Sequence, residues 1–491
     1  METLESRKQG IRIDELPQTF QDAIAVTRGL GIQYIWIDSL CIIQNDNLDW
    51  QRESAKMTTV YRRAHIVIGA SNATADSEGF LCTRATPTIS LGLIHVKLLP
   101  PYPKRLVTTL DPVSAEPLST RAWCLQERYL PRRMLLVGKD QMYWECSEMI
   151  ASEDGDCVPR DGDHFEQIKK TAAIDLSITG ISGRSPGETT DINYFDWYET
   201  VKEYAQRHIT KGSDRLPALG GLARALYGAT SDKYFAGIWQ KGLIEGLLWC
   251  RADGMQALSS PAVYRAPSWS WASVDGAINF PVYNFYDRCN WKFMMASFEP
   301  LATYVDSSLD LAGENPFGGI KDGWIKLQGP VLPIMTVRNW TEISYSPPEY
   351  VMNPFRSSAC NKVIETTITH NGKTETIFLD AGFDTSDRTV SQGTLFAVLI
   401  ARLPDPASPV YMDIRFGLIL EAVAQDKYKR VGMIDGVVKT QKATLLSRLS
   451  RKVHLENYLW EQPETKEEEE NPNLLGPDPF EGLEQTVVTI V

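Results

Sequence analysis

The chain has 491 residues, of which 43% are hydrophobic and 23% charged, so it can form two or three domains with apolar cores. No run approaches the roughly 18 apolar residues of a membrane-spanning helix, and the N-terminus lacks the apolar core of a secretory signal. The formal net charge of −12 argues against a nucleic-acid-binding protein. We therefore expect a cytoplasmic protein that binds neither nucleic acid nor membranes.

The first part of the chain alternates between helical and strand patterns. A helix is predicted to begin at Pro17 and to end at Gly31, where its apolar periodicity stops. Apolar residues over 34–38 predict a buried strand, a second helical pattern covers 49–63, and 65–70 predict another strand. Strand, helix and strand in this order form a βαβ unit, so the two strands should be parallel neighbours.

Acidic side chains follow the ends of these two predicted strands. Because the carboxyl ends of parallel strands meet at one edge of a sheet, Asp38 and Asp76 should converge there with Glu53. Glu53 falls within the apolar stripe of its helix, where a carboxylate must be paired, hydrogen-bonded or raised in pKa. Asp38, Ser39 and Asp76 are our candidates for ligand binding. The alternatives are a capping role for Asp38 and a hydrogen bond from backbone N–H groups or an arginine to Glu53.

Cysteine, histidine and known motifs give little support for other chemistry. The eight cysteines are scattered singly, with no Cys-x-x-Cys pair, which predicts reduced thiols and no zinc site. The chain lacks a Walker loop and a His-Glu-x-x-His helix. We expect neither a metal nor a bound cofactor.

A second acidic candidate lies on a helical pattern over 120–128. This pattern contains Gln126 and Glu127 together with Arg121 and Arg128. These side chains either form an ion-pair network or line the predicted ligand pocket at the edge of the sheet. A β-hairpin around 138–140 should follow this helix.

The rest of the chain changes from helical to β-rich patterns. Helical periodicity covers 193–209, 215–227 and 233–249, and short β-rich runs follow. A net charge of −7 over 461–482 predicts a solvated, mobile segment, and the apolar run 486–491 predicts a strand that pairs with the β-rich part. The expected organisation is an α/β domain at 1–150, a linker plus mainly helical region at 151–275, a β-rich region at 276–460, the acidic segment at 461–482 and a terminal strand at 483–491.

Several blocks of the first 150 residues resemble the fungal heterokaryon-incompatibility (HET) domain. They are Leu16-Pro17-x-Thr19-Phe20-x-Asp22, Leu30-Gly31-Ile32-x-Tyr34-Ile35-Trp36-Ile37-Asp38-Ser39-Leu40-Cys41, Asp49-Trp50-x-x-Glu53 with Met57, Tyr61 and Ala64, and Arg121-Ala-Trp123-Cys-Leu125-Gln126-Glu127-Arg128 with Trp144-Glu145-Cys146. The resemblance implies an α/β domain with a TIR-like or flavodoxin-like parallel sheet. It also implies a cytoplasmic fungal signalling or effector protein of allorecognition and programmed cell death.

The sequence departs from the family pattern at its start. HET domains normally open with a strand of the type Leu-Ser-Tyr-x-Trp-Gly, which has no counterpart before Leu16. A parallel sheet without that strand has open hydrogen-bonding edges, so we expect a non-catalytic interaction module that binds other signalling proteins or a second copy of itself.

The resemblance also implies an enzymatic alternative. HET domains are similar to TIR domains, some of which cleave NAD with a glutamate on the helix after a sheet strand. Asp49-Trp50-Gln-Arg-Glu53 is similar in spacing and placement. In this alternative the chain is an NAD glycohydrolase, Glu53 is its catalytic residue and NAD is its substrate.

Overall fold

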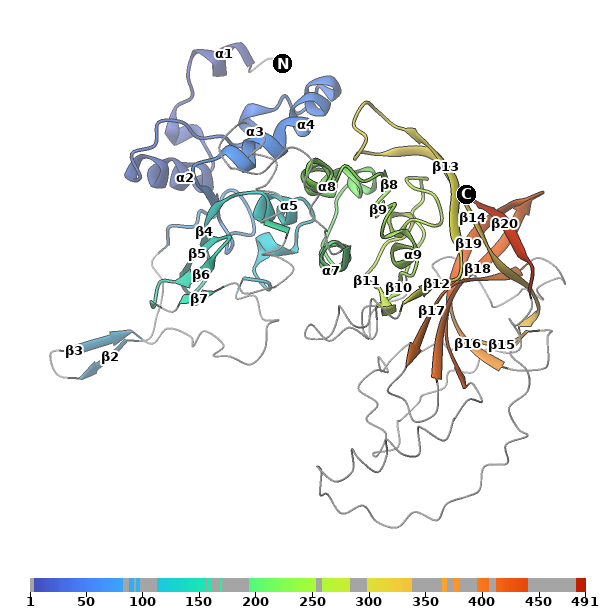
Figure 1. Cartoon of the computed structure of the whole chain (residues 1–491). Coiled ribbons are helices and arrows are strands. Elements are labelled where there is room, and N and C mark those ends of the chain that lie inside the picture. The colour runs from blue at the N-terminus through green and yellow to red at the C-terminus, as the bar shows by residue number, and fades with distance from the viewer. Residues whose placement is uncertain are drawn as a thin grey trace, which may run out of the picture. The chain divides into compact units, whose positions relative to one another are not determined.

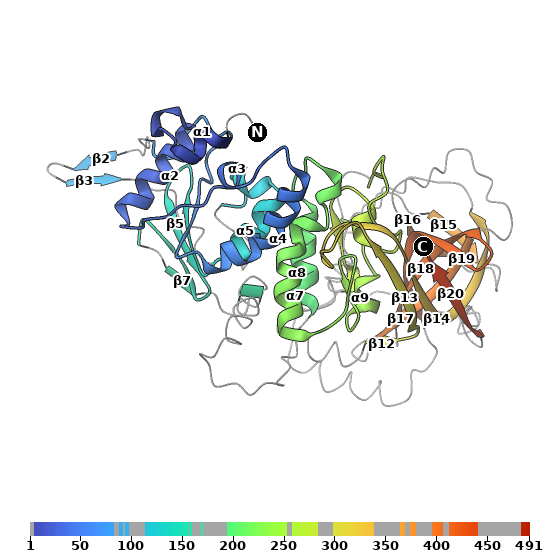
Figure 2. The ribbon, with the colours of Figure 1, turned by 90° about the horizontal axis from the view of Figure 1, so that it is seen from above.

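The chain forms two compact units in a computed structural model (Figures 1 and 2), the first comprising Met1–Gly237 and Leu311–Gly319 and the second Ile238–Asp310 and Ile320–Val491. The structure describes residues 4–82, 88–91, 94–97, 113–155, 157–159, 168–169, 194–252, 258–282, 298–337, 364–368, 374–379, 395–405, 412–439 and 483–491. None of the helices in these ranges is both long enough and apolar enough to cross a membrane.

The first unit combines helices with a small sheet. Its helices are α1 (Leu4–Gln9), α2 (Gln18–Gly29), α3 (Asp38–Cys41), α4 (Asn47–Arg63), α5 (Trp123–Tyr129), α7 (Tyr194–Ala205) and α8 (Pro217–Thr230), and its strands are β1 (Val67–Gly69), β2 (Thr88–Leu91), β3 (Ile94–Lys97), β4 (Arg133–Val137), β5 (Met142–Cys146), β6 (Met149–Ser152), β7 (Cys157–Pro159) and β8 (Tyr234–Phe235). The helices predicted over 49–63 and 120–128 and the hairpin predicted around 138–140 are confirmed by α4, α5 and the β4–β5 pair.

The larger sheet of this unit is mixed. Its strand order is β1-β4-β5-β6-β7, with a parallel pair between β1 and β4 and antiparallel pairs elsewhere. Met134, Leu136 and Tyr143 are buried together with Val113 on one side of it. The described part of the chain is therefore α/β, as expected, but its first sheet is not purely parallel.

The predicted pairing of strands 34–38 and 65–70 was wrong. Residues 32–37 form neither a helix nor a strand, Asp38 begins α3, and β1 pairs instead with β4. An apolar run becomes a strand only where a neighbouring backbone supplies hydrogen bonds, and no described residue accepts one from the backbone N–H groups of 33–36. Tyr34 is consequently 81% exposed instead of buried.

The first half of α2 is hydrogen-bonded to the segment that follows β1. The Asp22 carboxylate accepts hydrogen bonds from the backbone N–H groups of Phe80 and Leu81 at 2.7 and 2.9 Å. Gly79 precedes them with φ +74, and an added Cβ would lie 2.6 Å from the Asp22 carboxylate. Burial raises the pKa of Asp22, but the hydrogen bonds from Leu81, Phe80 and Gln18 outweigh it and leave the pKa below its ordinary value.

Three helices of the first unit meet at a glycine. The backbone N–H of Gly221 on α8 donates to the Gln126 side chain of α5 at 3.1 Å. A Cβ at this position would lie 2.6 Å from Gln126 Oε1 and 2.9 Å from Thr58 Oγ1 of α4. Glycine therefore allows α4, α5 and α8 to approach closely, which fixes the position of α4 relative to α5.

The helix predicted over 233–249 was also wrong. This range contains β8, β9 (Ile238–Trp239) and only one helical turn, α9 (Leu243–Gly246). Ala236 and Gly237 adopt positive φ angles of +43 and +99, a conformation that ends a right-handed helix. The apolar periodicity reports burial there, since Trp239 and Trp249 are fully buried.

The second unit is mostly antiparallel β structure. In addition to α9, its elements are β9 (Ile238–Trp239), β10 (Cys250–Arg251), β11 (Ile278–Asn279), β12 (Glu299–Pro300), β13 (Thr303–Leu311), β14 (Ile320–Val337), β15 (Ile364–Ile368), β16 (Thr374–Leu379), β17 (Leu395–Asp405), β18 (Met412–Ala424), β19 (Lys427–Lys439) and β20 (Gln485–Ile490). In Figure 1, β9 to β14 are coloured green to yellow and β15 to β20 orange to red. The predicted β-rich region is confirmed.

Pairing of these strands closes on itself. Successive antiparallel pairs join β14, β15, β16, β19, β18 and β17, and β17 pairs again with β14. β20 pairs antiparallel with β14 and parallel with β19, which confirms the strand predicted over 486–491. The acidic segment 461–482 lies outside the described residues.

A buried arginine joins the closed sheet to the tryptophan-rich segment of the same unit. Arg430 of β19 stacks on the Trp249 ring, with its guanidinium carbon 3.6 Å from the ring centroid. It also donates to the backbone oxygens of Leu247, at 2.5 Å, and Trp249. These contacts satisfy a guanidinium that is only 2% exposed.

Candidate functional site

The predicted site residues Asp38 and Ser39 form the first turn of α3. The Asp38 carboxylate accepts a hydrogen bond from the backbone N–H of Ser39 at 2.7 Å, and both residues are exposed. A hydrogen bond of this kind, within one turn, is what a capping role for Asp38 predicts. The charge of Asp38 nevertheless acts on α4 and α5, because it raises the pKa of Tyr61 and of Glu127.

The other two predicted residues have different neighbours. Glu53 forms an ion pair with Lys56 one turn later on α4, at 2.6 Å, and its side chain is 22% exposed. Asp76 is exposed, and its backbone oxygen accepts a hydrogen bond from Thr19 at the start of α2, at 2.9 Å. The argument that these carboxylates converge depended on two parallel strand ends, and the first of those strands is absent.

The structure brings a different acid to Asp38. Glu127 of α5 accepts side-chain hydrogen bonds from Tyr61 of α4 and from Cys124, which lies one turn earlier on α5. Trp36 packs edge-on against the Tyr61 ring, with a centroid distance of 5.7 Å. We call Asp38, Tyr61, Cys124 and Glu127 the acid cluster; α3, α4 and α5, which carry it, are labelled in Figure 1.

The protonation equilibria of Glu127, Tyr61 and Cys124 are shifted toward their neutral forms. Burial raises the pKa of Glu127, and the charge of Asp38 raises it further, whereas hydrogen bonds from Cys124 and Tyr61 and the charge of Arg121 act in the opposite direction. Burial and the neighbouring Glu127 likewise raise the pKa of Tyr61 and of Cys124. Glu127 as a whole residue is only partly buried, although burial of its carboxyl is the largest cause of the raised pKa.

This arrangement can hold and release a proton. A glutamate with a raised pKa keeps its proton closer to neutral pH and can act as a hydrogen-bond donor or general acid. Cys124, with its raised pKa, stays a thiol and is not an activated nucleophile. The described residues contain no group of His, Cys, Asp and Glu side chains that could hold a metal ion.

Glu127 was a candidate from the sequence, which did not decide between an ion-pair network and a place in the pocket lining. Of the two alternatives, an ion-pair network fits Arg128, which pairs with Glu145 at 2.8 Å, whereas Glu127 faces Tyr61 and Cys124. Their separation of three residues places Cys124 and Glu127 on one side of α5, which the sequence could have indicated. Tyr61 lies 66 positions before Glu127, and only the packing of α4 on α5 brings them together.

Comparison with known proteins identifies the N-terminal part of the chain. Residues 1–127 match the family model described as heterokaryon incompatibility protein (HET), and this range ends on Glu127 of the acid cluster. No curated protein and no solved structure matches the chain. Residues 1–127 are therefore a HET domain, and the resemblance expected from the sequence blocks is confirmed.

Proposed function

We propose that the chain acts in heterokaryon incompatibility, as a cytoplasmic fungal effector that arrests growth or triggers cell death when unlike hyphae fuse. The HET domain over residues 1–127 is the observation that carries this proposal, because it suggests a role in that process. We further propose that the domain acts by association and not by catalysis.

The surface around residues 33–37 supports association. Tyr34 is 81% and Ile35 39% exposed, and the backbone N–H groups of 33–36 donate to no described residue. Exposed apolar side chains beside open backbone donors are a template for pairing with another chain. The occupant we propose is a second copy of this chain, because two copies related by a twofold axis can satisfy each other's backbone groups.

Replacing Tyr34 and Ile35 tests this proposal. A Tyr34→Ser, Ile35→Ser variant should remain folded, since both side chains are exposed, but should sediment as a monomer and no longer arrest growth when expressed in hyphae. Leu81→Ser is the matched control, because Leu81 is 52% exposed in the same unit and outside the segment. A parent chain that is itself monomeric, or a double variant that still arrests growth, contradicts the proposal.

The alternative function is an NAD glycohydrolase of TIR-like mechanism. The parallel pair β1–β4, joined by a long crossover, supports a distant TIR-like or flavodoxin-like relationship of the first sheet. Glu53 is the candidate suggested by the sequence spacing, but its carboxylate is occupied by Lys56. Burial raises the pKa of Glu127, which supports it as the candidate acid for any such reaction.

Nicotinamide release from NAD separates the two functions. The interaction module predicts no release by the full-length chain. If release occurs, Glu53→Gln and Glu127→Gln identify the acid, because loss of one electrostatic contact to the transition state lowers turnover by about a hundredfold or more.

A further inference from the structure

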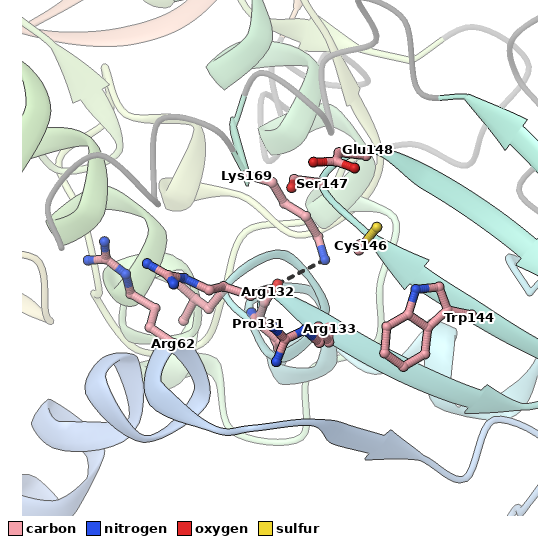
Figure 3. A pocket seen from close by; sticks show the side chains of 10 residues that line it. Arg62, Pro131, Arg132, Arg133, Trp144, Cys146, Ser147, Glu148 and Lys169 are labelled. Carbon is pink, nitrogen blue, oxygen red and sulfur yellow. Dashed lines mark hydrogen bonds between the residues drawn. The ribbon is translucent and has the colours of Figure 1, made fainter. Parts of the chain in front are cut away.

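The first unit contains a second site, which shares no residue with the acid cluster and lies mostly beyond the HET match over residues 1–127. A pocket of about 400 Å³ lies between the end of α4, the loop that leads from α5 into β4, and the turn between β5 and β6. Figure 3 shows Arg62, Arg132 and Arg133 on one side of it, with Lys169 and Glu148 on another. Its volume falls within the range of about 300–1,000 Å³ that is usual for small-molecule sites.

Positive charge dominates the lining of this pocket. Four of the lining side chains are cationic, and Glu148 is the acidic one. Arg132 and Arg133 are exposed and form no ion pair with any residue that the structure describes, although Arg133 donates to the His65 backbone oxygen at 3.4 Å. Like charges gathered at one concave surface repel one another, and a bound anion removes that repulsion.

At the buried end of the pocket, Lys169 is held in place by contacts within the protein. Lys169 is 4% exposed, and its ammonium donates to the Pro131 backbone oxygen at 3.1 Å, the bond drawn in Figure 3. It also lies 3.8 Å from Glu145, whose carboxylate is held at 2.8 Å by Arg128. Glu145 thus pairs with both Arg128 and Lys169 and fixes the inner wall of the pocket, while the exposed guanidinium groups of Arg132 and Arg133 supply its positive potential.

The remaining wall offers an apolar surface. Trp144 lines the pocket from β5, near Arg133 and far from Arg62, and its residue is only partly buried. An indole ring provides a flat contact for a planar apolar group, while guanidinium groups bind phosphate oxygens in pairs of parallel hydrogen bonds. We propose that this pocket binds a small organic phosphate that carries a flat ring, held by Arg132 and Arg133 at its phosphate and by Trp144 at its ring.

Titration calorimetry on the full-length chain tests the proposal with AMP, inorganic phosphate and adenosine as probes. We expect AMP to bind, inorganic phosphate to bind more weakly and adenosine not to bind. Affinity for AMP should fall as salt is raised, because screening weakens contacts to exposed guanidinium groups. Absence of AMP binding at millimolar concentration overturns the proposal.

Variants assign the binding to this pocket. Arg132→Gln with Arg133→Gln should weaken AMP binding by at least about tenfold, since each charged hydrogen bond is worth that much or more. Trp144→Leu should remove the preference for AMP over inorganic phosphate. The control is Arg28→Gln with Lys139→Gln, which removes two exposed cations of the same unit outside the pocket. Equal losses in the control and the Arg132, Arg133 variant would show nonspecific charge attraction and overturn the assignment.

Discussion

Removal of residues 485–491 is expected to destabilise the second unit by several kcal/mol. β20 fills the position between β14 and β19, and Val488 and Ile490 are fully buried there. Burial of an aliphatic side chain of this size contributes about 1.5–3 kcal/mol, and the deletion also exposes the backbone groups of two neighbouring strands. The Val491 backbone oxygen is held by Ser268 as well, through its N–H and its hydroxyl.

Hydrogen exchange of the β14 and β19 amides measures this effect within one unit, where a single unfolding free energy for the whole chain is not defined. The deletion should abolish strong protection of these amides, and Ile490→Ala alone should lower it by about 2–4 kcal/mol. Val487→Ser serves as the control, because Val487 lies on the same strand but is 49% exposed. Unchanged protection after the deletion would mean that β20 is not an interior strand.

Glu145→Ala is expected to destabilise the first unit by about 3–5 kcal/mol, because it leaves buried cations without their carboxylate. The Glu145 side chain is 0% exposed, receives hydrogen bonds from Arg128 at 2.8 Å and lies 3.8 Å from Lys169. Exchange of the β4 and β5 amides reports the change. Glu148→Ala, three positions later and exposed, should change protection by less than about 0.5 kcal/mol.

A companion variant separates charge from packing. Replacing Arg128, Glu145 and Lys169 together by methionine removes the charges at similar volume and should recover much of the loss. If the triple variant is as unstable as Glu145→Ala, packing and not charge compensation is the cause.

Helices and hairpins whose residues are close together in the chain were predictable from the sequence. The periodicity of 49–63 gave α4, and the turn residues 138–140 gave the β4–β5 hairpin, because neighbours in the chain determine both. The apolar run 34–38 has the composition of a strand, but a strand also needs a partner, and composition does not supply one. At 233–249 the left-handed turn at Ala236 and Gly237 overrides an apolar pattern that reports burial.

The candidate site was predictable only in part. Asp38 was chosen as the acid at the end of a predicted strand; the structure places it at the start of α3, where its charge acts on Glu127, and its role in ligand binding stays a prediction. Its neighbours were not found, because Tyr61 and Glu127 meet through the packing of α4 against α5, which depends on a glycine of α8. The closed ring of strands in the second unit is similarly non-local, since β17 returns to β14 across more than sixty positions.

Radial growth of hyphae that express a Glu53→Gln, Glu127→Gln variant tests our proposal that the HET domain acts by association and not by catalysis. The amides keep the shape of both acids, and glutamine resembles the protonated form that the raised pKa of Glu127 favours, so the fold should persist. If the domain acts by association, this variant should arrest growth as strongly as the parent chain does. A folded double variant that no longer arrests growth would contradict it.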